Sequence, residues 1–467
     1  MGGIYMKKRI LSALAAVCLA CSLVTSCASS SSQTDASSAS SSSASESSSA
    51  AESSSAADSS SEAAPVYDYE HGTDGYFNLL DECKQFKLKT QQSGTCWLYA
   101  GRASMQTAYE KQTGKELNME IADMLDAIYR DDKQEGFFVK SGIDKGELGG
   151  WQSMISATLS RGFKDGIVLD SSVDIDPTDR EAIKNVLRTR GGIAAETLDK
   201  PLGKGTFGKY FTINYSSAEE MDHDVTIIGY DDHFPKEYFI NPASQDGAWI
   251  VYNSNMGDML CYISYDAPFG YTLSHTASEK YFDVLSYDAG NEMDRYVSTG
   301  DSTKVANVFR KKGKLAAVGT FNISDKQDIK IEIMSADFKN VLYTQDATLD
   351  YYGYQIIELT KPIDVEDYAV VITYPKGAPV EGETIQSAAF SYKTSIEKGQ
   401  SFVFAGGKWL DMSESDIKTA VKTNRVPSAL NSETGAWKDY LTAADVEQMT
   451  KTDFTPNNAC IKALFVK

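Results

Sequence analysis

Three residues spread widely along the chain have the side chains of a nucleophilic site. Cys96 stands in the run Gln92-Ser93-Gly94-Thr95-Cys96-Trp97, and His223 and Asn253 follow much further on. A thiol attacks well at neutral pH only as a thiolate, which an adjacent imidazole stabilises. The imidazole in turn needs a partner that fixes its ring and tautomer. The order cysteine, histidine, asparagine therefore indicates a Cys96 nucleophile, a His223 base and an orienting Asn253 amide.

The local pattern around each of these residues predicts the element that positions it. Gly94-Thr95 is a turn with a helix N-cap residue, and the helical pattern that follows ends at Gly114. Cys96 would lie in the first turn, where the positive end of the helix dipole stabilises a thiolate. His223 opens a β-rich run, and Asn253 ends an apolar strand. The long separation of Cys96 from His223 requires a fold whose two halves bring them together.

These segments resemble the papain-like cysteine peptidases, whose patterns are roughly G-x-C-W, H-A-V-x-x-x-G-Y and W-x-x-x-N-S-W-G. The resemblance covers about residues 78 to 285. It implies an endopeptidase in which Cys96 attacks the scissile carbonyl and His223 passes its proton to the leaving amine. Gly149 and Gly150 resemble the paired glycines that line the main specificity pocket of the family. A protein or peptide substrate is implied, and no cofactor.

Three positions depart from the family pattern. The family places its oxyanion-hole glutamine six residues before the nucleophile, where this chain has Thr90. Either the loop is one residue shorter and Gln91 serves, beside the backbone N–H of Cys96, or the hole is altered. We predict Gln91, because the next turn can absorb a one-residue deletion. Asp224 replaces the small apolar residue after the histidine, and Asn255 replaces a tryptophan that shields the histidine–asparagine pair.

The N-terminal segment predicts export and lipid attachment. A basic start at Lys7-Lys8-Arg9 precedes an apolar run, Ile10 to Val24, which is too short for a good transmembrane helix. The run ends in Val24-Thr25-Ser26-Cys27, which resembles a bacterial lipobox with a lipidated Cys27. We expect residues 1–27 to be a lipoprotein signal peptide, anchored at the outer face of the cell membrane. Residues 28–65, rich in Ser, Ala and Glu, predict a disordered tether spanning roughly 30–40 Å.

Hydrophobic periodicity divides the remaining chain into two predicted domains, 66–286 and 287–467. Apolar spacing is helical before His223 and strand-like after it. The predicted fold class is α+β, with a helical lobe and a β lobe as in papain-like peptidases, followed by an antiparallel β-sandwich. The expected helices of the first domain are 97–111, 119–129, 151–163 and 180–187, and its expected strands are 225–230, 238–240, 249–253 and 261–265.

Beyond residue 286, short alternating runs recur between turn signals, and the alternation is strict in Asp328–Ile333. This segment is similar to the lectin-like domain attached to some bacterial papain-like peptidases. The composition of residues 413–458 predicts a polar insertion with a short helix near 443–449. The expected strands are 315–323, 329–334, 354–359, 368–374, 402–404 and 460–466.

Composition limits other functions. The formal charge of −20 argues against nucleic-acid binding. The sequence holds neither an H-E-x-x-H motif nor a Cys/His cluster, so no metal is predicted. The cysteines beyond Cys27 are too few and scattered for a disulfide framework, although a Cys83–Cys261 bridge stays open.

Two rival functions also stay open. A cell-wall amidase or transpeptidase can use the same Cys–His chemistry, but those small folds usually place the two residues closer in sequence. A surface adhesin would use the sandwich to bind a cell-surface glycan and carry a weakened peptidase domain. In that case the aromatics would form a sugar-stacking platform, whereas at this spacing aromatics more often belong to a core: Tyr351, Tyr352, Tyr354 and Trp409. The complete triad favours the peptidase.

Overall fold

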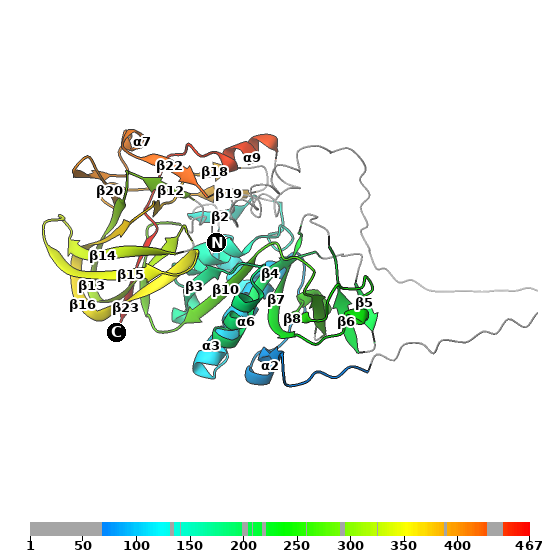
Figure 1. Ribbon diagram of the computed structural model, residues 1–467. Coiled ribbons are helices and arrows are strands. Elements are labelled where there is room, and N and C mark those ends of the chain that lie inside the picture. The colour runs from blue at the N-terminus through cyan, green and yellow to red at the C-terminus, as the bar shows by residue number, and fades with distance from the viewer. Residues whose placement is uncertain are drawn as a thin grey trace, which may run out of the picture. The chain divides into compact units, whose positions relative to one another are not determined.

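The computed structural model describes residues 68–130, 135–140, 142–198, 204–207, 209–216, 221–257, 259–289, 295–324, 326–386, 390–426 and 442–467. The predicted signal peptide, its Cys27 and the predicted tether lie outside the described residues. Among the described residues, no helix has both the length and the apolar character needed to cross a bilayer. Sheet dominates the structure, with few helices (Figure 1).

The main helix, α3 (Cys96–Thr113), is buried on nearly all sides. It ends at Gly114, whose φ of 71° is the left-handed conformation that glycine adopts most readily, so the predicted stop is confirmed. The helix packs against strands β7 and β10 (Figure 1). The other helices, with 3₁₀ turns labelled η, are α2 (Leu79–Glu82), α4 (Ile121–Ile128), α5 (Gln152–Leu159), η1 (Lys164–Gly166), α6 (Arg180–Thr189), η2 (Lys236–Tyr238), η3 (Ser254–Met256), α7 (Ile417–Ala420) and α9 (Ala443–Thr450).

Strand β7 (His223–Asp231) is buried along its whole length and is central to the sheet behind α3. It pairs antiparallel with β1, β4 and β8, while β8 pairs with β9 and β10 pairs with β3 and β4. The bounds of these and the neighbouring strands are β1 (Tyr76–Asn78), β2 (Gly136–Val139), β3 (Val168–Asp174), β4 (Ile193–Thr197), β5 (Lys204–Phe207), β6 (Tyr210–Ile213), β8 (Ala248–Tyr252), β9 (Leu260–Ser264), β10 (Thr272–Ser278) and β11 (Asp283–Leu285).

The strand predicted at 238–240 is wrong. The chain forms the 3₁₀ turn η2 there, with the N–H of Tyr238 donating to the carbonyl of Pro235. Proline fixes φ near −65°, which suits the start of a turn. The aromatic residues of this run are buried against Tyr210 in a small cluster of their own. The apolar residues that suggested a strand are therefore explained by this local packing.

The sandwich is built on two long antiparallel strands, β13 (Thr303–Asn322) and β16 (Gly353–Tyr374), which lie side by side (Figure 1). The strands expected at 354–359 and 368–374 are parts of one strand, because β16 continues through Pro362 opposite a register shift. The remaining strands are β12 (Arg295–Ser298), β14 (Gln327–Ser335), β15 (Val341–Leu349), β17 (Ala378–Pro379), β18 (Ile385–Gln386), β19 (Phe390–Lys393), β20 (Ser401–Ala405), β21 (Lys408–Asp411), β22 (Lys422–Arg425) and β23 (Ile461–Val466).

The two predicted domains share hydrogen-bonded sheets and a buried core. Strand β3 pairs with β16, and β2 pairs with β19, so hydrogen-bonded sheets continue from one part into the other. One buried cluster includes Trp97 and Trp151 from the first part together with Tyr354 and Tyr392 from the second. The sandwich also has its own core between the long strands and the small sheet β17–β12–β22. The described chain from residue 68 onward accordingly falls in one compact unit.

Candidate active site

Cys96 is the first residue of α3, as predicted, and its side chain is partly exposed. Thr95 occupies the N-cap position, but its hydroxyl donates to the carbonyl of Gln92 at 2.5 Å and caps no helix N–H. Ser93 has a φ of 61°, an uncommon conformation for a residue other than glycine. The loop before Cys96 is therefore held in a tight turn that presents the thiol at the helix N-terminus.

His223 and Asn253 form a direct pair. Their side chains lie at the start of β7 and directly after β8, with 2.9 Å between His223 Nε2 and Asn253 Oδ1. Asn253 Oδ1 also accepts the N–H of Asn255 at 3.0 Å, which fixes the amide so that its oxygen faces the imidazole. A hydrogen on Nε2 satisfies this contact, because the Asn253 oxygen can only accept. His223 is 4% and Asn253 8% exposed, so the pair is covered although Asn255 replaces the shielding tryptophan.

Gln91 links the loop before Cys96 to the residue after Asn253. Its backbone N–H donates to the carbonyl of Ser254 at 2.9 Å, and its Oε1 accepts the Ser254 hydroxyl at 2.6 Å. The Gln91 Nε2 donates to the carbonyl of Ser93 at 3.0 Å, which orients the amide nitrogen toward the nucleophile loop. Thr90, by contrast, is exposed and lies beside Gly257.

The glycine pair lies beside the nucleophile loop. A Cβ at Gly150 would stand 2.4 Å from the ring of Trp97, the residue after Cys96, so only glycine fits there. Gly149 has a φ of 81°, and its carbonyl accepts the Tyr129 hydroxyl at 2.6 Å. The segment just before this pair packs its carbonyls against Gly94. The glycine pair and the segment before it thus pack against the loop and helix start that carry Cys96.

A buried polar cluster behind His223 was not predicted. The Asp224 carboxylate accepts the Tyr271 hydroxyl at 2.6 Å and the Gln152 Nε2 at 2.7 Å. The same Gln152 nitrogen donates to the carbonyl of Trp97 at 2.8 Å, and its oxygen contacts His275 Nε2 at 2.9 Å. Asp224 thereby ties the strand that carries His223 to the helix that carries Cys96.

Burial sets the protonation of this cluster. It raises the pKa of Asp224 to about 6, against the hydrogen bonds from Tyr271 and Gln152 and the charge of His223. It also lowers the pKa of His275 to about 3, so that this imidazole is neutral. Burial and the Asp224 charge hold the pKa of Tyr271 well above its usual range, with Cys96 as a further, smaller cause. Tyr271 therefore lies within electrostatic reach of the nucleophile.

Asp224→Asn is expected to change how stability depends on pH. Because the folded-state pKa of Asp224 is raised, its contribution to the free energy of unfolding falls as pH rises from about 4 to about 6. The total loss is about 3 kcal/mol. Urea unfolding should show that, between pH 4 and pH 7, the free energy of unfolding of the variant rises by about this much relative to that of the parent. Asp222→Asn, an exposed carboxylate on the other side of His223, is the matched control. Parallel pH profiles for parent and Asp224→Asn would contradict the expectation.

The other described cysteines differ from Cys96. Cys83, Cys261 and Cys460 are buried and form no disulfide with one another, so a Cys83–Cys261 bridge is absent from the structure. Burial raises the pKa of Cys83 to about 11, which makes it a poor nucleophile. Within the part of the chain that the structure describes, no cluster of His, Cys, Asp or Glu side chains has the makings of a metal site.

The fold is that of a papain-like cysteine protease joined to a lectin-like domain, as the resemblance implied. Residues 284–425 match the family described as a lectin like domain. The clostridial cysteine protease Cwp84 after propeptide cleavage matches with a TM-score of 0.56 and 14% identity, over 83% of this chain and 98% of that chain. The cysteine protease and lectin-like domains of Cwp84, a surface layer associated protein of Clostridium difficile, match at 0.55 and 14%, over 84% and 89%. At this identity the likeness establishes the fold. No curated protein matches the sequence.

Proposed function

We propose that the protein is a papain-like cysteine endopeptidase, anchored through a lipid on Cys27 at the outer face of a bacterial membrane. The observation that carries the peptidase assignment is the buried His223–Asn253 hydrogen bond, 2.9 Å long, between the start of β7 and the residue after β8. Cys96 stands at the start of α3, His223 stands at the start of β7, and Asn253 directly follows β8. The sequence order of these three residues and the elements that carry them both support the assignment.

The chemistry follows from these positions. The Cys96 thiolate attacks the substrate carbonyl carbon, and the resulting oxyanion accepts hydrogen bonds from the Cys96 backbone N–H and from Gln91 Nε2. The first N–H groups of a helix have no acceptor within the helix, which suits them to this task. His223 gives its proton to the leaving amine and then takes one from the water that hydrolyses the acyl-enzyme, while Asn253 holds the ring.

The test is hydrolysis of an unfolded protein by the purified chain under reducing conditions. Fragments should appear, and prior treatment with an epoxide directed at thiolate peptidases should prevent them. Isolated peptidoglycan, offered in parallel, separates this function from a cell-wall amidase or transpeptidase. Release of cell-wall peptides with no cleavage of protein would contradict the endopeptidase assignment.

Cys27→Ala is expected to release the protein from the membrane fraction or to leave an uncleaved precursor. The lipobox-like Val24-Thr25-Ser26-Cys27 is the basis, because the lipid is attached to that cysteine. Metabolic labelling with a fatty-acid analogue should mark the parent and a Cys21→Ala control, whose change lies within the discarded signal. Equal labelling of Cys27→Ala would contradict the anchor.

Glycan binding is a second candidate function, favoured by the lectin-like match of residues 284–425. The four aromatics do not form a single platform. Tyr354 is 0% exposed within a core cluster, and Trp409 stacks on Phe338 with 4.4 Å between ring centroids. Binding of the Cys96→Ala chain to a glycan array would support the adhesin alternative.

A further inference from the structure

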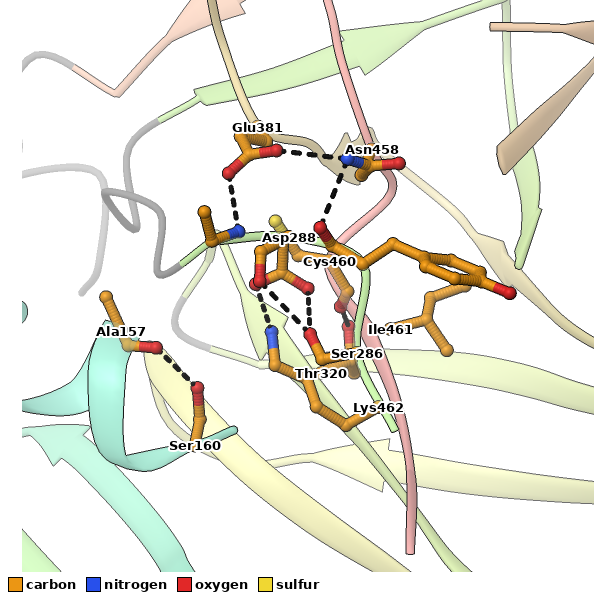
Figure 2. A network of polar contacts seen from close by, with 12 residues as sticks. Ala157, Ser160, Ser286, Asp288, Thr320, Glu381, Asn458, Cys460, Ile461 and Lys462 are labelled. Carbon is orange, nitrogen blue, oxygen red and sulfur yellow. Dashed lines mark hydrogen bonds and ion pairs between the residues drawn. The ribbon is translucent and has the colours of Figure 1, made fainter. Parts of the chain in front are cut away.

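A fully buried pair of opposite charges lies outside the candidate active site (Figure 2). Lys462 is on β23, and Asp288 follows β11; both side chains are 0% exposed, with 2.5 Å between Nζ and Oδ2. Asp288 stands near the beginning of the lectin-like part, and Lys462 stands near the end of the chain. The contact therefore joins β23 to the segment at the beginning of the lectin-like match.

The surroundings of Lys462 suit an ammonium ion poorly. An ammonium carries three N–H donors. Among the described residues, Asp288 Oδ2 is the only hydrogen-bond acceptor that the Lys462 Nζ contacts. Its other close neighbours are the rings of Phe321 and Tyr354, with centroids at 4.7 and 5.9 Å, which attract a cation but accept no conventional hydrogen bond. A buried ion pair is costly unless its remaining donors are satisfied, whereas an amide has a single N–H.

The two oxygens of Asp288 have different environments. Oδ1 accepts the Ser286 hydroxyl at 2.7 Å, and Oδ2 faces the Lys462 nitrogen (Figure 2). The hydroxyl would polarise the C–Oδ1 bond and stabilise negative charge on that oxygen. Oδ2 is the oxygen that can leave. The Lys462 nitrogen therefore lies beside the oxygen that would leave, while the other oxygen is held by Ser286.

A second buried carboxyl group lies next to the pair. Glu381 is 0% exposed, and its Oε1 accepts the backbone N–H of Ala289, the residue after Asp288, at 2.6 Å. The same oxygen accepts the Tyr392 hydroxyl, and Oε2 accepts Asn458 Nδ2. Burial, and then the neighbouring Asp288, raise the pKa of Glu381 to about 7. Glu381 therefore holds the backbone directly after Asp288.

We propose that Lys462 Nζ and Asp288 Cγ are joined by an intramolecular amide bond, formed by the protein itself with loss of water. Proton transfer within the pair gives a neutral amine and a neutral carboxylic acid. The amine attacks Cγ, a nitrogen–carbon bond forms, and the bond from Cγ to Oδ2 breaks. Of the three ammonium hydrogens, one stays on the amide and two leave with Oδ2 as water. No oxidant, reductant or co-reactant is needed.

Proximity and burial favour this condensation. Well-oriented intramolecular reactions reach effective molarities of about 10⁵–10⁸ M. The site is closed to solvent, which disfavours the reverse hydrolysis. The product would tie the beginning of the lectin-like part covalently to the last strand of the chain. Such a tie would resist unfolding from either end, and the inference is independent of the proposed peptidase activity.

The test is a peptide map of the full chain digested with trypsin after denaturation and reduction. The proposal predicts a branched peptide that joins residues 281–295 to residues 452–467, lighter than the sum of its parts by one water molecule. Fragmentation should place the link on Asp288, and not on Asp283 in the same peptide. Asp283 is a built-in control, because it pairs with Lys311 in a half-buried ion pair. Separate, unlinked peptides containing Asp288 and Lys462 would overturn the proposal.

Variants separate the bond from a simple ion pair. Lys462→Arg keeps the charge but should yield unlinked peptides and a chain that is no longer lighter by water. Asp288→Asn should give the same branched peptide as the parent, because ammonia replaces water as the leaving group. The parent map decides the bond itself even if a variant fails to fold.

Discussion

Cys96→Ala is expected to abolish peptide-bond hydrolysis, with kcat lowered by about 10⁶-fold, while the fold is retained. No other described cysteine can replace it, because Cys83, Cys261 and Cys460 are buried. Cys83→Ala, which removes a thiol from the core behind α3, is the matched control and should keep near-parental kcat. Hydrolysis by purified Cys96→Ala at the parental rate would refute the peptidase assignment.

The same assay should rank the other two members of the triad. His223→Ala should lose activity almost as fully as Cys96→Ala, since the imidazole both stabilises the thiolate and transfers the proton. Asn253→Ala should lose less, because Asn253 acts through its hydrogen bond to His223 Nε2. Equal, small effects for all three variants would show that the activity arises elsewhere.

Gln91→Ala is expected to lower kcat by about 10²–10³-fold with little change in KM. The loss corresponds to about 3–4 kcal/mol of transition-state stabilisation by one oxyanion-hole donor. The Ser254 hydroxyl donates to the side-chain Oε1 of Gln91. The side-chain Nε2 is therefore left on the side of the loop before Cys96. Steady-state kinetics on a peptide substrate would measure both constants.

The neighbouring side chains provide the controls for Gln91. Thr90 and Gln92 are exposed, so Thr90→Ala and Gln92→Ala should each cost less than about tenfold. A large loss for Gln92→Ala and none for Gln91→Ala would mean that the loop has a different register. If none of the three changes matters, backbone N–H groups alone form the oxyanion hole.

The sequence predicted the parts of the site that depend on local pattern. The turn before Cys96, the start of α3 and its stop at Gly114 follow from residues that are neighbours in sequence. The positions of His223 and Asn253 at strand ends follow from apolar runs bounded by turn signals. Motif order then linked these separate segments, which periodicity alone could not do.

The sequence could not predict contacts between distant segments. Asp224 was seen only as a departure from a pattern, because its partners Gln152 and Tyr271 lie far away in the chain. The shared core also escaped prediction, since an apolar strand such as the one at Tyr354 does not reveal which neighbour buries it. The burial of Lys462 is likewise a tertiary fact, as lysine in an alternating strand normally points to solvent.

Locating the adduct of an epoxide or vinyl-sulfone probe tests the central claim most directly. Such probes report a nucleophilic thiolate beside a working histidine, so the modified residue identifies the site without knowledge of the substrate. The purified native chain should carry one adduct, on Cys96, and His223→Ala should carry almost none. Failure of native Cys96 to react, or equal labelling of the parent and His223→Ala, would contradict the Cys96–His223–Asn253 peptidase.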